Sequence, residues 1–75
     1  MKMTDLQCQG LAYEAAYFRY AALKGAPIQT FIFHAEGDRK RMEAIHRAYK
    51  LRRVNDFNTA VTEAMIEEYR KCSKS

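Results

Sequence analysis

The chain has little of what fixes many small folds: no tryptophan, one proline, three glycines and two cysteines in 75 residues. Cys8 and Cys72 are too few for the disulfide framework of small secreted domains, so we expect both to be reduced, with a single disulfide between them as the alternative. The glycines are isolated, which excludes a glycine-rich loop around a phosphate. The longest uncharged run, residues 25–35, contains Pro27 and is far shorter than the roughly 20 residues that span a bilayer.

These absences limit the class of protein. No apolar stretch of signal-peptide length follows residues 1–5, so we expect a soluble, cytoplasmic protein with no membrane partner. The two histidines, His34 and His46, and the two cysteines match no paired zinc spacing, and we expect no metal or other cofactor. No nucleophile, base and orienting group can be argued into a catalytic set, and the chain is short for a typical pocket. We therefore expect neither an enzyme nor a small-molecule substrate.

Length and charge both point to partners. A single domain over residues 1–75 buries only roughly 60% of its unfolded surface, so a second subunit would add stability. Thirteen Lys and Arg residues against nine Asp and Glu give a net charge of +4, and residues 39–53 hold seven of the cations with one acid, Glu43. Such a run is typical of phosphate contact, and also of surface helices that are charged only for solubility. The charge therefore permits nucleic-acid binding without requiring it.

Residues 4–24 are expected to form a helix. Thr4 and Gln7 have the spacing of a capping box, and Gly25 is a natural residue at a helix end. At about 100° per residue, one apolar face lies opposite another that carries Tyr13, Tyr17 and Tyr20. A helix that is apolar on most sides is normally covered by more than one neighbour. We interpret the tyrosines either as half-buried packing residues or as a surface that binds a protein.

Residues 28–35 are rich in β-branched and aromatic types, which predicts a strand. The chain offers no second strand, so we expect this one to pair with the same strand of a second molecule and form a homodimer. The alternative is helical, with Pro27 as the first residue of a long helix that runs to Arg53.

Two more helices are predicted downstream, from Asp38 to Arg53 and from Asn58 to Cys72. Asp38 is a candidate N-cap for the first, and Asn55, Asp56 and Asn58 are candidates for the second. The predicted fold class is thus mainly α, with an N-terminal helix followed by a strand-helix-helix unit over residues 29–72. An all-α three-helix protein is the alternative.

The order strand, helix, short turn, helix over about residues 29–70 resembles the ribbon-helix-helix (Arc-type) family of DNA-binding proteins. The segment from Asn58 to Tyr69 is similar to the last helix of that family in its polar start, its aliphatic and small residues and its aromatic end. Phe31 and Phe33 are similar to the two inward residues of the family's strand. The resemblance implies a two-stranded ribbon in the major groove and a phosphate at the start of the last helix. The DNA contacts that it implies are Thr30, Ile32, His34, Arg39, Lys40, Arg41 and Asn55.

Two functions follow as hypotheses. The first is a small homodimeric transcriptional regulator of phage, plasmid or bacterial origin that binds double-stranded DNA. Ile32 offers no hydrogen bond to a base edge, and Asp56 opposes a phosphate at the turn, so the same surfaces also suit contact with a protein. The second hypothesis is therefore a small phage-type interaction protein. It binds and inhibits or adapts a host protein through Tyr13, Tyr17 and Tyr20 and through the outer face of the predicted ribbon, without binding DNA.

Overall fold

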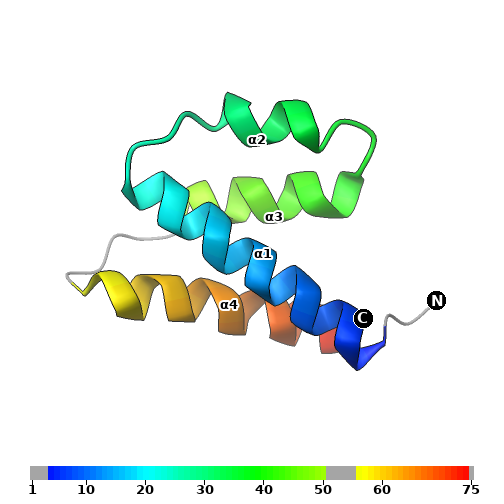
Figure 1. The fold of residues 1–75 in the computed structure, drawn as a ribbon. Helices are drawn as coiled ribbons and strands as arrows, with labels where there is room; N and C mark the ends of the chain where they lie inside the picture. The colour runs from blue at the N-terminus through cyan, green and yellow to red at the C-terminus, as the bar shows by residue number, and fades with distance from the viewer. Residues whose placement is uncertain (1–3, 51–55, 75) are drawn as a thin grey trace.

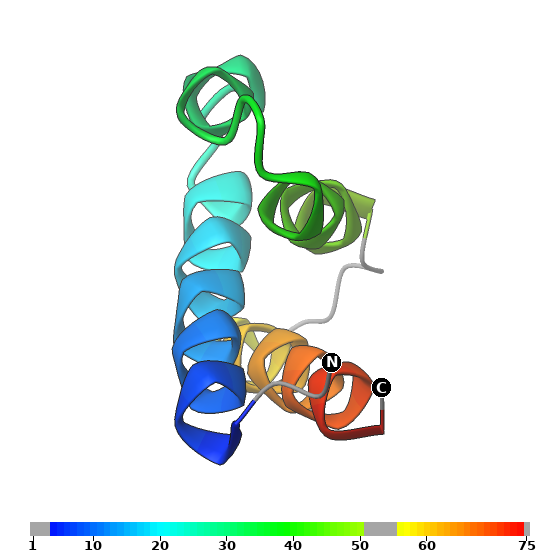
Figure 2. The ribbon, with the colours of Figure 1, turned by 90° about the vertical axis from the view of Figure 1, so that its right-hand side faces the viewer.

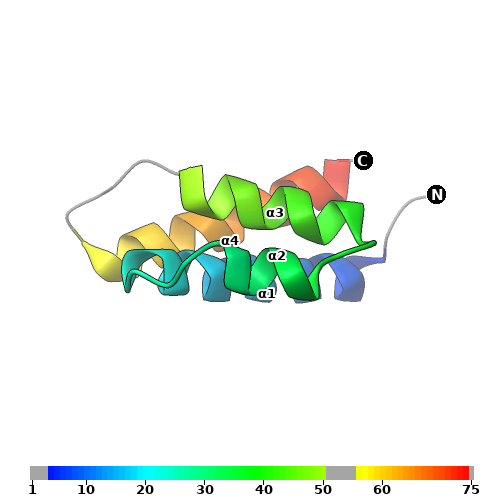
Figure 3. The same ribbon diagram turned by 90° about the horizontal axis from the view of Figure 1, so that it is seen from above.

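The structure, a computed structural model, describes residues 4–50 and 56–74, and these form four α-helices and no strand. In chain order the helices are α1 (Asp5–Leu23), α2 (Gln29–His34), α3 (Arg39–Lys50) and α4 (Phe57–Lys74). Helix α1 organises the others, because α3 and α4 both pack on one side of it (Figures 1 and 2). Helices α2 and α3 run in opposite directions beside the C-terminal half of α1 (Figures 1 and 3). Within the described residues, no helix combines the length and the apolar character needed to cross a membrane.

Helix α1 begins as the sequence predicts. The Oγ1 atom of Thr4 accepts a hydrogen bond from the backbone N–H of Gln7 at 3.1 Å, and Oε1 of Gln7 accepts one from the backbone N–H of Thr4 at 2.8 Å. This reciprocal pair is the predicted capping box. After the helix ends, Gly25 has φ +89°, a conformation that glycine adopts without the steric cost of a Cβ atom.

The strand predicted over residues 28–35 is wrong, because this segment contains α2. The backbone N–H of Ile32 donates to the carbonyl of Ile28 at 3.1 Å, and that of Ala35 donates to the carbonyl of Phe31 at 3.0 Å. The segment thus satisfies its own backbone and needs no second strand. These four residues have the spacing of one helical face and pack in the core. The predicted strand-helix-helix unit and its intermolecular ribbon are therefore not present in the part of the chain that the structure describes.

The alternative of one long helix from Pro27 to Arg53 is also wrong, because the chain turns between α2 and α3. Gly37 has φ +88° in this turn. Asp38 then caps α3, since its Oδ1 accepts the backbone N–H of Arg41 at 3.1 Å, as predicted. The fold is all-helical, which agrees with the class of the all-α alternative but not with its three helices.

Helix α1 packs on its neighbours in two different ways. Toward α2 and α3 the buried residues are Phe18, Ala35, Ile45 and Ala48, and partly buried Ile28, Phe31, Ile32 and Tyr49 surround them. The buried residues of α4 are instead small, apart from one glutamate, and they match small residues on α1. This second set comprises Cys8, Ala12 and Ala15 of α1 with Ala60, Ala64 and Cys72 of α4.

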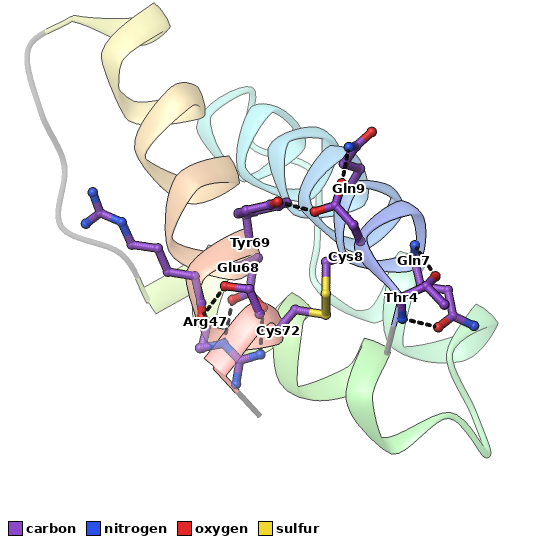
Figure 4. Close-up of a disulfide and its surroundings, with 11 residues drawn as sticks. Thr4, Gln7, Cys8, Gln9, Arg47, Glu68, Tyr69 and Cys72 are labelled. Carbon is purple, nitrogen blue, oxygen red and sulfur yellow. Dashed lines mark hydrogen bonds and ion pairs between the residues drawn. A yellow bond between two sulfur atoms is a disulfide. The ribbon is translucent and has the colours of Figure 1, made fainter. Parts of the chain in front are cut away.

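A disulfide joins Cys8 to Cys72, whose Cα atoms lie 5.5 Å apart across a sequence separation of 64 (Figure 4). The prediction of two reduced cysteines is wrong, and the alternative of one disulfide is the arrangement found. The bond ties the beginning of α1 to the end of α4. It therefore fastens the interface whose apolar residues are the smallest.

Candidate protein-interaction face

Helix α1 carries four large apolar residues that are exposed in the structure. Their exposed fractions are 77% for Leu6, 66% for Tyr13, 59% for Tyr17 and 45% for Tyr20. Residues 6, 13 and 20 are seven apart and residue 17 falls between the last two, so all four lie along one line on the helix. We call these four residues the outer face of α1.

Neighbouring aromatic rings hold two of the tyrosines in place. The ring of Tyr17 meets Phe31 of α2 edge to face, with centroids 5.6 Å apart. The ring of Tyr20 meets Phe57 of α4 in the same way at 5.2 Å, and the Lys24 ammonium lies 5.7 Å from the Tyr20 centroid. Such contacts restrict the rings before any partner arrives, which lowers the entropy cost of binding.

An apolar groove borders the outer face between α1 and α4. It encloses about 380 Å³ beside Tyr13, and its lining includes Ile66, which is 42% exposed. Its lining also includes the polar residues Gln9, Arg70 and Ser73. The apolar surface therefore continues from α1 onto α4 together with polar groups, a mixture found in many protein interfaces.

The strand residues predicted to read DNA do not form one face. Thr30 and His34 are exposed on α2, a helix of six residues, whereas Ile32 is partly buried against the core. The reading face predicted from period-two alternation is therefore wrong, because the helical period separates these side chains. Asn55, the predicted contact at the turn, lies outside the described residues.

The predicted basic contacts divide into exposed and paired residues. Arg39 and Lys40 are exposed at the start of α3. Arg41 instead donates two hydrogen bonds to the carboxylate of Glu14 on α1, at 2.8 and 3.3 Å. Arg39 also lies 3.9 Å from Glu43. Part of the positive charge is thus compensated inside the molecule and contributes less to attracting phosphates.

An ion pair that the sequence analysis missed joins α3 to α4 (Figure 4). Arg47 donates to both carboxylate oxygens of Glu68, at 2.5 and 2.8 Å, and the Glu68 side chain is only 7% exposed. The hydrogen bonds to Glu68 raise the pKa of the Arg47 guanidinium. A signal was present, because Glu68 falls on the apolar stripe of α4 between Ala64 and Cys72, where an acid needs a buried partner.

Two tyrosines that do not belong to the outer face each donate a hydrogen bond within the chain. The hydroxyl of Tyr49 donates to the carbonyl of Ala26 at 2.8 Å, and burial raises its pKa. The hydroxyl of Tyr69 donates to the carboxylate of Asp5, and this hydrogen bond raises the pKa of Tyr69 (Figure 4). Both fasten neighbouring elements to the ends of α1, so their hydroxyl groups already have partners within the chain.

Comparison of the chain with protein-family models, with curated proteins and with solved structures found no match. Among the described residues, no three His, Cys, Asp or Glu side chains are grouped so that they could hold a metal ion.

Proposed function

We propose that this protein acts by binding another polypeptide through the outer face of α1, and that the bound element is an α-helix. The observation that carries the proposal is the line of exposed residues formed by Leu6, Tyr13, Tyr17 and Tyr20. Its alternating steps of three, four and seven residues are those of a coiled-coil seam, which buries such residues against a second helix. Tyrosine is also among the residues that contribute most to binding at protein interfaces.

The size of the outer face supports this proposal. Its four side chains expose on the order of 400 Å² of surface, estimated from the usual area of aromatic residues. Contiguous apolar patches of this size on small proteins are often functional. Phe57 and Ile66, both exposed on α4, extend the patch toward the roughly 800 Å² that each partner buries in a standard interface.

DNA binding receives less support from the same geometry. The proposed ribbon required a strand over residues 28–35, but the centre of that segment is the helix α2, Gln29–His34. Of the predicted basic contacts, Arg41 is already paired with Glu14. A protein partner is therefore the better proposal, and a sequence-specific regulator is the alternative that the experiment must distinguish.

The disulfide bears on where the protein acts. Disulfides persist in oxidising compartments and are rare in the reducing cytoplasm. Because Cys8 and Cys72 are joined, we place the working form of the protein in an oxidising environment, in contrast to the cytoplasmic location expected from the sequence.

Site-specific photo-crosslinking in the cell that makes the protein tests the proposal. A benzophenone side chain is placed at Tyr17 on the outer face or, as the matched control, at exposed His46 on α3. We expect a discrete protein adduct from position 17 alone, which disappears when Tyr13 and Tyr20 are both changed to Glu. Adducts with DNA, or equal protein adducts from both positions, would contradict the proposal.

A further inference from the structure

We infer that the helix bound by the outer face is α1 of a second copy of this chain, paired antiparallel about a two-fold axis that crosses the outer face at the level of Ala15. This inference rests on the proposed function, because it names the partner of the same face. It depends on three features of α1: the symmetry of its exposed seam, an exposed glycine within it, and opposite charges at its two ends.

The exposed seam is longer than the four apolar residues. Gly10 and Lys24 are also exposed and fall on the same line, so the seam comprises residues 6, 10, 13, 17, 20 and 24. The steps are four, three, four, three and four residues, the spacing of core positions in a coiled coil. This series reads the same in both directions and is centred on Ala15. Two copies of α1 laid antiparallel about that point therefore bring every seam position opposite another seam position.

Gly10 has no evident role within one chain. Glycine is a poor residue for the interior of a helix, yet Gly10 lies within α1 and does not have a positive φ. A Cβ atom added there would meet nothing within 4 Å, so no close contact in the chain requires glycine. In the antiparallel pair, Gly10 faces Tyr20 of the second copy. The missing side chain leaves a notch for the largest ring that must fit there.

The remaining seam positions are complementary in the same register. Tyr13 faces Tyr17 of the second copy, and offset or edge-on packing of such rings is favourable. Leu6 faces Lys24 of the second copy, whose aliphatic stem can cover it while the ammonium, which lies over the Tyr20 and Phe57 rings within one chain, turns to Asp5. The two-fold axis repeats each of these contacts. A parallel pair would instead bring Asp5 to Asp5 and Lys24 to Lys24, which is unfavourable at both ends.

Analytical ultracentrifugation of the purified, oxidised protein tests the pairing. We expect a dimer, and we expect Tyr17→Glu to raise its dissociation constant at least tenfold. Gly10→Leu should raise that constant by a similar factor while leaving the melting temperature of the monomer unchanged or higher, because leucine is the better helix former. The matched control is His46→Leu, which adds a leucine to an exposed position on α3 and should leave the dissociation constant unchanged.

A charge exchange tests the antiparallel register. Asp5→Lys and Lys24→Asp should each weaken self-association, which would not happen in a parallel pair, because its ends carry like charges before and after either change. An equimolar mixture should then form a heterodimer with both pairs restored. Circular dichroism of each variant checks that α1 is still folded, because Asp5 also binds Tyr69. A mixture that associates no better than its components would overturn the register.

The results separate the inference from the proposed function. A wild-type chain that stays monomeric at millimolar concentration overturns self-pairing, as does a dimer that is insensitive to both Tyr17→Glu and Gly10→Leu. If such a chain still gives a foreign protein adduct from position 17, the proposed function stands and only the identity of the partner is wrong. If it gives no adduct at all, both are wrong.

Discussion

The two long sides of α1 are both apolar, but they are built from residues of different size. Toward α4 the inner side buries small residues, among them Cys8, Ala12 and Ala15, whereas the outer face exposes tyrosines such as Tyr13. Alanine permits close approach of α4 but contributes little apolar area. A disulfide supplements that interface, whereas the large rings of the outer face stay exposed within the chain. The inner side of α1 is thus packed within the chain, whereas the outer face is the surface for which we propose a partner.

Among the interactions on the inner side of α1, the disulfide should contribute most to the free energy of unfolding. Changing Cys8 and Cys72 together to Ala removes a link that closes a loop across a sequence separation of 64, so we expect a loss of about 4 kcal/mol in the free energy of unfolding. Urea denaturation of the oxidised wild type and the double variant measures it. A loss below about 1 kcal/mol would mean that the alanine interface holds α4 without the link.

The ion pair between α3 and α4 should make the next largest contribution to the free energy of unfolding. Arg47→Met leaves the buried Glu68 carboxylate without its main partner, and we expect a loss of about 3 kcal/mol, at the low end for buried pairs because the Arg47 side chain is 35% exposed. The control is Arg47→Met combined with Glu68→Leu, which removes both charges and should recover most of the loss. Equal stability of the single and double variants would show that the charge of Glu68 is not the cause.

A matched pair of leucine substitutions compares the two sides directly. Ala15→Leu adds volume to the packed inner side and should cost about 2 kcal/mol. Tyr13→Leu alters the outer face and should change the stability of the monomer by less than about 0.5 kcal/mol. Thermal denaturation at a concentration that keeps the chain monomeric gives both values. Similar losses from the two substitutions would remove the distinction between the sides.

The smallest predicted effect is a dependence of stability on pH that arises from Asp56 at the start of α4. The hydroxyl of Thr59 and the backbone N–H of Asn58 donate to Asp56 and lower its pKa below the ordinary value of 3.8. The contribution of Asp56 to stability is therefore complete above that ordinary value and is lost as pH falls through the lowered pKa. The melting temperature of Asp56→Ala should lie below that of the wild type at neutral pH, and the two should converge below pH 3.8. A gap that does not change with pH would contradict this.

Local signals in the sequence were sufficient for part of the fold. The capping box of Thr4 and the N-cap of Asp38 act within a few residues, so the beginnings of α1 and α3 were predictable. The strand was predicted from the β-branched and aromatic residue types of the segment. The helical spacing of Ile28, Phe31 and Ile32, which pack against the core, was given less weight, and the prediction was wrong. Tertiary packing decides such conflicts between propensity and period.

The parts that could not be predicted depend on distant pairs. Nothing near Cys8 or Cys72 indicates that the start of α1 and the end of α4 meet, since this follows only from α4 lying along α1. The sequence did single out the tyrosines of the outer face, because a helical projection needs only the residue spacing. Their exposure is now visible in the structure, whereas their role in binding stays a proposal.

Hydroxyl-radical footprinting of the tyrosines tests most directly whether the outer face is uncovered within the chain and covered by a partner. The probe is applied to the dilute purified protein and to the cell that makes it, and modification is located by mass spectrometry. We predict that Tyr13, Tyr17 and Tyr20 react strongly in dilute solution and are protected in the cell, while Tyr49 is protected in both. Equal reactivity of the three tyrosines in the two settings would contradict the account.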